Sequence, residues 1–176
     1  MKFIYKIFLT FNSVALMIVV FLIKEHIVLP VNMGLLKWEY TSYIVYGLGL
    51  LVFSGVCLLL TRLLSKDVIE GGIKEIELAN NSYLPTYLGY FFVALSVNDL
   101  STMICVFFIV FIFTFNSQSL FFNPMFLLFG YKFYLITLEN GMRLFVVSQQ
   151  EIKTRKPLLF DNLARINDYT FIDRRK

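Results

Sequence analysis

The stretch LPTYLGYFFVALSVNDLSTMICVFFIVFIFTF, residues 84–115, decides how this chain is organised. It is almost entirely apolar, yet Asn98 and Asp99 stand near its middle. As one helix its 32 residues would span about 48 Å, whereas the hydrocarbon core of a bilayer is about 30 Å thick. Because Asn and Asp cap helix N-termini, we expect a helical hairpin with arms at about 83–97 and 100–115. The arms are short, so a re-entrant hairpin or a locally thinned bilayer is an alternative to two full spans.

The composition points to a membrane protein. Apolar residues make up 58% of the 176 residues and Phe alone contributes 20, and the mean hydropathy is +0.72. Soluble domains are usually about 45–50% apolar. Two further apolar blocks, at about 3–23 and 43–64, are each long enough to cross a bilayer as a helix. The basic first residues are not followed by a small-residue cleavage site after block one, so we interpret that block as an uncleaved anchor.

Together the apolar blocks predict an α-helical membrane protein with four transmembrane helices. We expect a transmembrane domain at 1–116, with spans at about 3–23, 43–64, 83–97 and 100–115 and a cytoplasmic loop at 65–82. The remaining residues, 117–176, are then a cytoplasmic region that contains a β-hairpin.

The basic residues predict the orientation. The chain has 16 Lys and Arg residues, and in bacteria such residues favour the cytoplasmic side. If 84–115 is a hairpin, only Lys24 and Lys37 lie outside, which leaves 14 of the 16 inside. If it is a single span, the nine basic residues that follow it lie outside instead. The charge distribution therefore favours the hairpin, with both termini on the cytoplasmic side of the membrane.

The C-terminal region predicts strands. The stretch KFYLITLENGMRLFVVSQ holds Asn140-Gly141, a strong hairpin signal, between runs rich in β-branched and aromatic residues. A two-residue turn there pairs Leu138–Arg143, Ile136–Phe145 and Tyr134–Val147. Both faces of this hairpin are apolar, so it needs a cover, and Ile73–Leu78 partly alternates and could add a strand.

Two alternatives concern the same region. A fifth span over Leu120–Leu138 competes with the hairpin, but Pro124, Gly130 and Lys132 argue against it. After Pro157 the tail predicts one short helix with Asp161 as its cap.

The sequence offers no reaction centre. It has no serine-nucleophile motif, no phosphate-binding glycine loop and no metal constellation. The two cysteines and one histidine lack ligand spacing. We therefore expect no catalytic, cofactor-binding or metal-binding residues, and the protein is not expected to be an enzyme. The polar patch Thr10, Asn12 and Ser13 is expected to bond backbone carbonyls or a neighbouring helix, with a pore lining as the alternative.

The candidate docking residues fall into two groups. Asn140, Gly141 and Arg143 belong to the hairpin, whose apolar strands need a partner or another subunit. Lys153, Arg155 and Lys156 form the densest basic patch, which could bind a partner protein or anionic lipid. The alternative is that these charges only orient the chain, and direct binding of nucleic acid is not expected.

The segments NNSYLPTYLGYFFVAL and FFNPMFLLFGYKFYLITLENG, within Asn80–Gly141, together with the four-span arrangement, resemble KwaA, the small membrane subunit of the bacterial Kiwa anti-phage defence system. The resemblance covers the last two predicted spans, the loop before them and the β-hairpin. It implies a homo-oligomer in the inner membrane that senses phage attachment or injection. It also implies a cytosolic, DNA-binding partner similar to KwaB, which acts on the phage.

The resulting functional hypothesis is a non-enzymatic inner-membrane sensor and scaffold that recruits a cytosolic partner. The alternative is a small oligomeric channel or membrane-permeabilising effector. No ionisable residue lies in the middle of a predicted span, which disfavours an ion-coupled transporter but is compatible with a channel.

Overall fold

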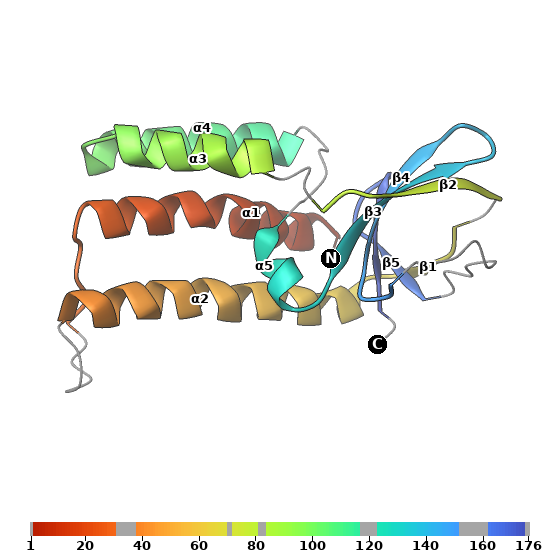
Figure 1. The fold of residues 1–176 in the computed structure, drawn as a ribbon, viewed down its shortest axis with the longest axis horizontal. Coiled ribbons are helices and arrows are strands. Elements are labelled where there is room, and N and C mark those ends of the chain that lie inside the picture. Colours follow the sequence, from red (N-terminus) through yellow and green to blue (C-terminus); the bar gives the residue numbers. More distant parts are fainter. Residues whose placement is uncertain are drawn as a thin grey trace.

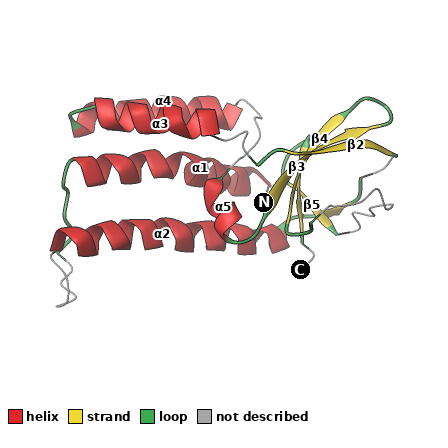
Figure 2. Cartoon of the chain, in the orientation of Figure 1, coloured by secondary structure: helices red, strands yellow, loops and turns green. Residues whose placement is uncertain are grey.

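The protein consists of a bundle of apolar helices with a β-sheet at one end (Figures 1 and 2). The first turn of the N-terminal helix and the last strand of the chain both lie at the sheet end. The computed structural model describes residues 2–30, 38–69, 72–80, 84–116, 123–151 and 162–174.

Helix α1 (Lys2–Lys24) is the central helix of the bundle. It packs against α2 (Trp38–Leu60) on one side and against α3 (Leu84–Ser96) and α4 (Leu100–Asn116) on the other (Figure 1). Helices α1 and α2 have 23 residues each, or about 35 Å of helix. A short 3₁₀ turn, η1 (Thr61–Leu63), extends α2 toward the sheet.

The apolar stretch 84–115 breaks where its sequence predicted. The Thr102 backbone N–H donates to Asp99 Oδ1 at 2.8 Å, so Asp99 caps α4 and the expectation of a capping carboxylate is confirmed. At the same turn the Lys24 ammonium donates to the Val97 carbonyl and, at 2.8 Å, to Asn98 Oδ1. The cation of α1 thereby binds the end of α3, where the helix dipole favours positive charge.

The prediction of a four-span α-helical membrane protein with a small β-hairpin region is wrong as a description of the fold. In the described part of the chain, only Phe3–Lys24 and Trp38–Leu63 are both long and apolar enough to cross a membrane. Helix α3 has 13 residues and α4 has 17, or about 20 Å and 26 Å, so each is shorter than the hydrocarbon core of about 30 Å. The β-part is also far larger than one hairpin.

The sheet has six strands in the order β1-β5-β6-β4-β3-β2. All neighbours are antiparallel except β4 and β6, which are parallel. The strands are β1 (Lys66–Asp67), β2 (Ile73–Leu78), β3 (Lys132–Leu138), β4 (Arg143–Ser148), β5 (Leu163–Arg165) and β6 (Thr170–Asp173).

Three sequence predictions can be compared with these strands. The proposed strand at Ile73–Leu78 is confirmed as β2, which pairs with β3. The argument against a fifth span over Leu120–Leu138 is confirmed, because Lys132–Leu138 is a strand and the only helix described between α4 and this strand is the short α5 (Pro124–Leu128). The helix predicted in the tail is wrong where the tail is described, since β5 and β6 lie there, and Asp161 is outside the described residues.

The predicted β3–β4 hairpin exists, but its register differs by one residue. Gly141 has φ of +81° and its N–H donates to the Leu138 carbonyl at 2.9 Å. Leu138 in turn pairs with Met142, so the loop has three residues and Gly141 alone takes the left-handed conformation. The observed pairs are therefore Thr137–Arg143, Ile136–Leu144, Leu135–Phe145 and Tyr134–Val146.

The sheet is curled and has a core on each face. Its two edge strands, β1 and β2, are joined by the five residues 68–72, which reach about 21 Å when extended, whereas six flat strands would place the edges about 24 Å apart. The concave face holds a buried cluster that includes Tyr134, Ile136 and Phe171. The other face packs onto the ends of the helices through a cluster formed by Tyr5, Leu9, Leu64, Phe126, Phe133, Phe145, Val147, Ala164, Ile166 and Ile172.

The cap at Asp99 gives a prediction about stability and pH. Hydrogen bonds from Thr102 lower the pKa of the Asp99 carboxyl below its ordinary value of 3.8. A lowered pKa in the folded state stabilises the fold above the ordinary pKa, and the contribution is lost as pH falls through the lowered one. We therefore expect this contribution to be constant near neutral pH and to disappear only below about pH 4.

The measurement is thermal unfolding of the detergent-solubilised protein at pH 7. Asp99→Asn keeps a capping side chain and should have nearly the wild-type midpoint, whereas Asp99→Leu should unfold at a lower temperature. Equal midpoints for the two variants would show that the capping bond contributes nothing.

Candidate membrane interface and docking surface

The outward faces of the helices are apolar from one end of the bundle to the other. No charged residue occurs in α2 after Glu39, and Arg62 is the next one along the chain. Soluble proteins rarely expose continuous apolar patches of this kind, so these faces need an apolar environment. The exposed side chains are Ile44, Leu48, Val52, Val56 and Leu59 on α2, and Leu100, Ile104, Phe108, Ile109, Ile112 and Phe113 on α4.

The polar side chains of the bundle point inward. Thr10, Asn12 and Ser13 of α1 are all buried. The Ser54 hydroxyl of α2 donates to Asn12 Oδ1 at 2.9 Å, and the Tyr87 hydroxyl of α3 donates to the Ser13 carbonyl at 3.0 Å. Thr10 donates to the carbonyl one turn earlier in its own helix at 2.8 Å. The expectation that this patch bonds carbonyls or a neighbouring helix is confirmed.

The end of the bundle remote from the sheet is closed by hydrogen bonds between α1, its following loop and α2. The Tyr46 hydroxyl donates to the Ile27 carbonyl at 2.9 Å, and the Leu29 N–H donates to the Ser42 hydroxyl at 3.0 Å. Lys24 lies here too and is already bound to the α3–α4 turn. Among the residues that the structure describes, this end therefore carries little free positive charge.

The sheet end of the bundle carries exposed basic residues. Arg62 and Lys66 are exposed where α2 leads into the sheet, and the Lys6 ammonium lies 4.5 Å from the ring centroid of Phe115. Burial is the main cause that raises the pKa of Tyr131; the Asp173 carboxylate adds to it, while the charge of nearby Arg62 opposes it. Positive charge is thus concentrated on the side where the sheet and both chain ends lie.

A single arginine joins the last strand to the end of α2. The Arg174 guanidinium, just after β6, donates through Nη2 to the Thr61 carbonyl and, at 2.6 Å, to the Leu64 carbonyl. Both carbonyls lie at the end of a helical segment; the Thr61 carbonyl also accepts the Leu64 N–H at 3.1 Å, and Arg174 adds to this bond. The tail of the chain therefore holds the sheet against the bundle.

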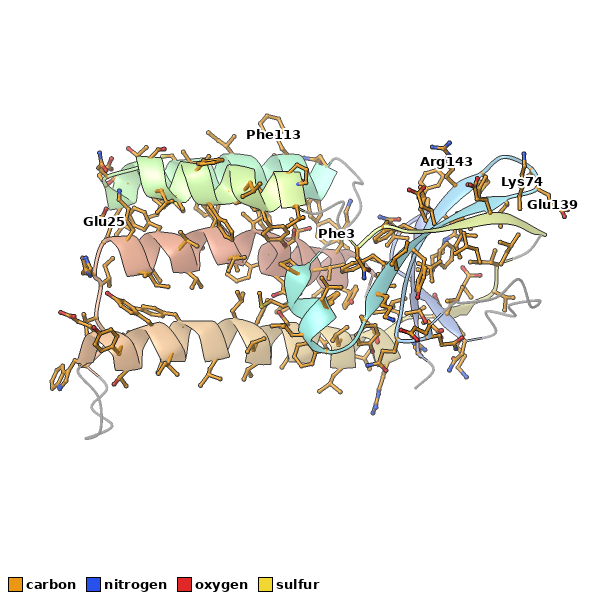
Figure 3. The ribbon with its side chains drawn as sticks, in the orientation of Figure 1. Phe3, Glu25, Lys74, Phe113, Glu139 and Arg143 are labelled. Carbon is orange, nitrogen blue, oxygen red and sulfur yellow. The ribbon has the colours of Figure 1, made fainter. Side chains whose placement is uncertain are left out.

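The predicted docking residues of the hairpin come together at its tip. Asn140 is exposed, but its side chain accepts from the Met142 N–H at 2.9 Å and so supports the turn. Arg143 is exposed and lies in register with Thr137 and Glu75, which forms a polar row across β4, β3 and β2. Figure 3 shows Arg143 on the hairpin, away from the bundle.

The basic patch Lys153, Arg155 and Lys156 lies outside the described residues, so its relation to the hairpin tip stays a prediction. The sequence interpretation missed two features of the junction: Arg174, which no local pattern marks, and the helix α5. For α5 a signal existed, since Asn123-Pro124 is a helix start and the Met125 N–H donates to Asn123 Oδ1 at 2.9 Å.

The described residues hold no cluster of three His, Cys, Asp or Glu side chains suited to a metal ion. What they do present is an apolar bundle with two helices of membrane-crossing length, and a curled mixed sheet at its basic end. These features point to a small protein that associates with a membrane through its helices and carries a folded β-sheet at one end of the bundle.

The chain belongs to the family of the anti-phage protein KwaA, whose family model matches residues 5–172. The match spans the bundle and the sheet together, so anti-phage defence is the process in which the whole fold takes part. Comparisons with curated proteins and with solved structures give no match.

The hairpin tip gives a stability prediction. Because Gly141 has φ of +81°, Gly141→Val forces a β-branched residue into the left-handed region and should destabilise the fold by about 1–2 kcal/mol. Gly141→Asn is the matched control, since Asn tolerates this conformation. Thermal unfolding in detergent should show the Val variant well below the Asn variant; coincident curves would mean that the tip has relaxed to another turn.

Proposed function

We propose that the protein is a non-enzymatic subunit of an anti-phage defence complex in the bacterial inner membrane. Helices α1 and α2 cross the bilayer, and the α3–α4 hairpin packs beside α1 from the sheet side. The sheet and both termini lie in the cytoplasm. The subunit forms a homo-oligomer, senses disturbance of the membrane by phage, and recruits a cytosolic, DNA-binding partner similar to KwaB.

The observation that carries this proposal is the asymmetry of the bundle. Among the described residues, one end has Lys6, Arg62 and Lys66, the sheet and the last strand, whereas the basic residue described at the other end, Lys24, is bound within the fold. Basic residues near spans favour the cytoplasmic side. The apolar outward faces of α2 and α4 supply the surface that lipid and neighbouring subunits would cover.

The sheet supports a docking role. Its strands are buried on both faces near the bundle, but the row Glu75, Thr137 and Arg143 turns polar side chains of both signs away from the concave core. Such a mixed-charge surface on a rigid sheet suits a soluble partner whose charges are complementary. Edge strand β2 carries Lys74, Glu75 and Glu77, charges that discourage unspecific strand pairing.

The topology predicts the outcome of reporter fusions. A reporter fused after Lys37 should be active on the periplasmic side, and one fused after Lys176 should be active in the cytoplasm, because α1 and α2 cross once each and the remaining helices return to the sheet side. A C-terminal reporter that is active outside would reverse the orientation and exclude a cytosolic partner.

The docking surface predicts a charge-specific effect on the partner. Arg143→Glu should strongly reduce co-purification of the KwaB-like protein and lower protection in a plaque assay, since reversing an interface charge costs affinity. Arg143→Lys should be milder. Lys66→Glu, an exposed reversal on the opposite edge strand β1, is the matched control and should leave co-purification intact. If both reversals act equally, the partner responds to net charge and not to the hairpin tip.

A further inference from the structure

The short helix α5 (Pro124–Leu128) packs against α2 at the junction with the sheet (Figure 1). The ring of Phe129, the residue after α5, lies against Gly55 of α2: a Cβ at Gly55 would lie 3.5 Å from the ring. The exposed residues Val52 and Leu59 are the neighbours of Gly55 one turn away on the same face of α2. Helix α5 therefore continues the outward apolar face of α2.

The outward side of α5 is unusually apolar. Leu128 is 70% exposed and Phe129 is 37% exposed, so the surface at this point consists of large hydrophobic side chains on both α2 and α5. The inward side is equally apolar, because Phe126 is buried in the cluster that also contains Phe133 and Phe145 of the sheet. A helix that is apolar on both sides has no face suited to water.

The backbone of α5 is bonded as a low-dielectric environment requires. The residues that follow α5 form backbone hydrogen bonds to its last turn. The Phe126 carbonyl accepts from the Phe129 and Tyr131 N–H groups at 3.1 and 3.0 Å, and the Gly130 N–H donates to the Leu127 carbonyl at 3.0 Å. The exposed Phe129 carbonyl accepts from Gln149 Nε2 at 3.0 Å. Few of the backbone polar groups of this segment therefore require a hydrogen bond to water.

The position along α2 sets the depth. Gly55 precedes Arg62 by seven residues, or about 10 Å along a helix. If the exposed Arg62 guanidinium lies at the level of the phosphates, Phe129 lies about 10 Å below them. This is the depth at which the apolar side chains of interfacial helices lie, about 5–10 Å inside the headgroup boundary.

We propose that α5 is a wedge in the cytoplasmic leaflet that binds anionic phospholipid: Leu128 and Phe129 contact the acyl chains and Arg62 binds the phosphate. The inference rests on the proposed crossing of the bilayer by α2, and it identifies the part of the protein that senses the bilayer. Only Gly130 and Tyr131 separate the wedge residue Phe129 from β3, and Phe126 links the wedge to the sheet core. A change in leaflet packing that moves α5 is thereby passed to β3.

Tryptophan placed at single positions tests the depth. Trp38 is the one tryptophan of the chain, so Trp38→Phe gives a background for Leu128→Trp, for Val52→Trp on the lipid face of α2, and for Tyr169→Trp, exposed at the far side of the sheet. The proteins are placed in nanodiscs of phosphatidylcholine brominated on its acyl chains. We expect the tryptophans at positions 52 and 128 to be quenched to a similar extent, and the one at 169 to be quenched by aqueous iodide only.

Three results would overturn the wedge. Quenching at 52 but not at 128, with iodide reaching 128, leaves the membrane crossing intact and places α5 in water. Protection at 128 from both quenchers means that a second copy or another protein covers α5. Loss of lipid quenching at 52 as well rejects the proposed crossing itself, and the wedge with it.

The headgroup contact has its own readout. The ratio of quenching at position 128 by brominated phosphatidylglycerol and by brominated phosphatidylcholine reports preference for the anionic lipid. Arg62→Gln should lower this preference about fivefold, the equivalent of about 1 kcal/mol for one basic residue at an anionic surface, while Arg62→Lys should keep it. An unchanged ratio in Arg62→Gln would reject the phosphate site at Arg62.

Discussion

The hydrogen bonds from Arg174 to the carbonyls of Thr61 and Leu64 are the constraint on which the two halves of the structure depend. The last carbonyls of a helix lack their usual partner one turn further on. Here the Thr61 carbonyl accepts the Leu64 N–H, and the Arg174 side chain adds a second donor to Thr61 and a donor to the Leu64 carbonyl. This donor lies just after β6, far from α2 along the chain. The side chain that satisfies α2 is also the one that fixes the last strand, so the sheet has a defined position on the bundle.

The bundle itself depends on α1. Lipid chains are as apolar as Leu, so burial alone gives little drive for helices to associate in a membrane, and close packing and buried hydrogen bonds become the main sources of specificity. Phe11 meets Phe53 and Phe107 edge to face at centroid distances of 5.5 and 5.8 Å. The Asn12–Ser54 bond adds one polar contact between α1 and α2. Helix α1 is thus bound on both sides by contacts that lipid cannot replace.

Features formed by residues that are close in the sequence could be predicted, whereas features formed by residues far apart in the sequence could not. The break at Asn98-Asp99 and the β3–β4 hairpin each depend on neighbouring residues, and both are present. The register was missed because Asn140-Gly141 suggested a two-residue turn, whereas only Gly141 has a positive φ. The apolar content of α3 and α4 suggested two spans, but their lengths were the decisive property.

The six-stranded sheet could not be predicted from short-range sequence patterns. Strands β1 and β5 have two and three residues, which is too short for a period of two to show. The parallel pairing of β4 with β6 joins segments with more than twenty residues between them. Of the candidate docking residues, Asn140, Gly141 and Arg143 do lie together because they share one hairpin. The role of Arg174 depends on a contact 113 residues away along the chain, for which no sequence spacing is diagnostic.

The place of β6 in the sheet has a consequence for biosynthesis. It is the last strand to be made, yet it lies in the middle, between β5 and β4. The sheet can therefore close only after the chain has been made as far as β6, whereas α1 and α2 are synthesised much earlier. Until then β4 lacks the neighbour on its side away from β3. The order of synthesis places the helices first and this central strand after the others, so a chain interrupted before Thr170 would have its helices but no finished sheet.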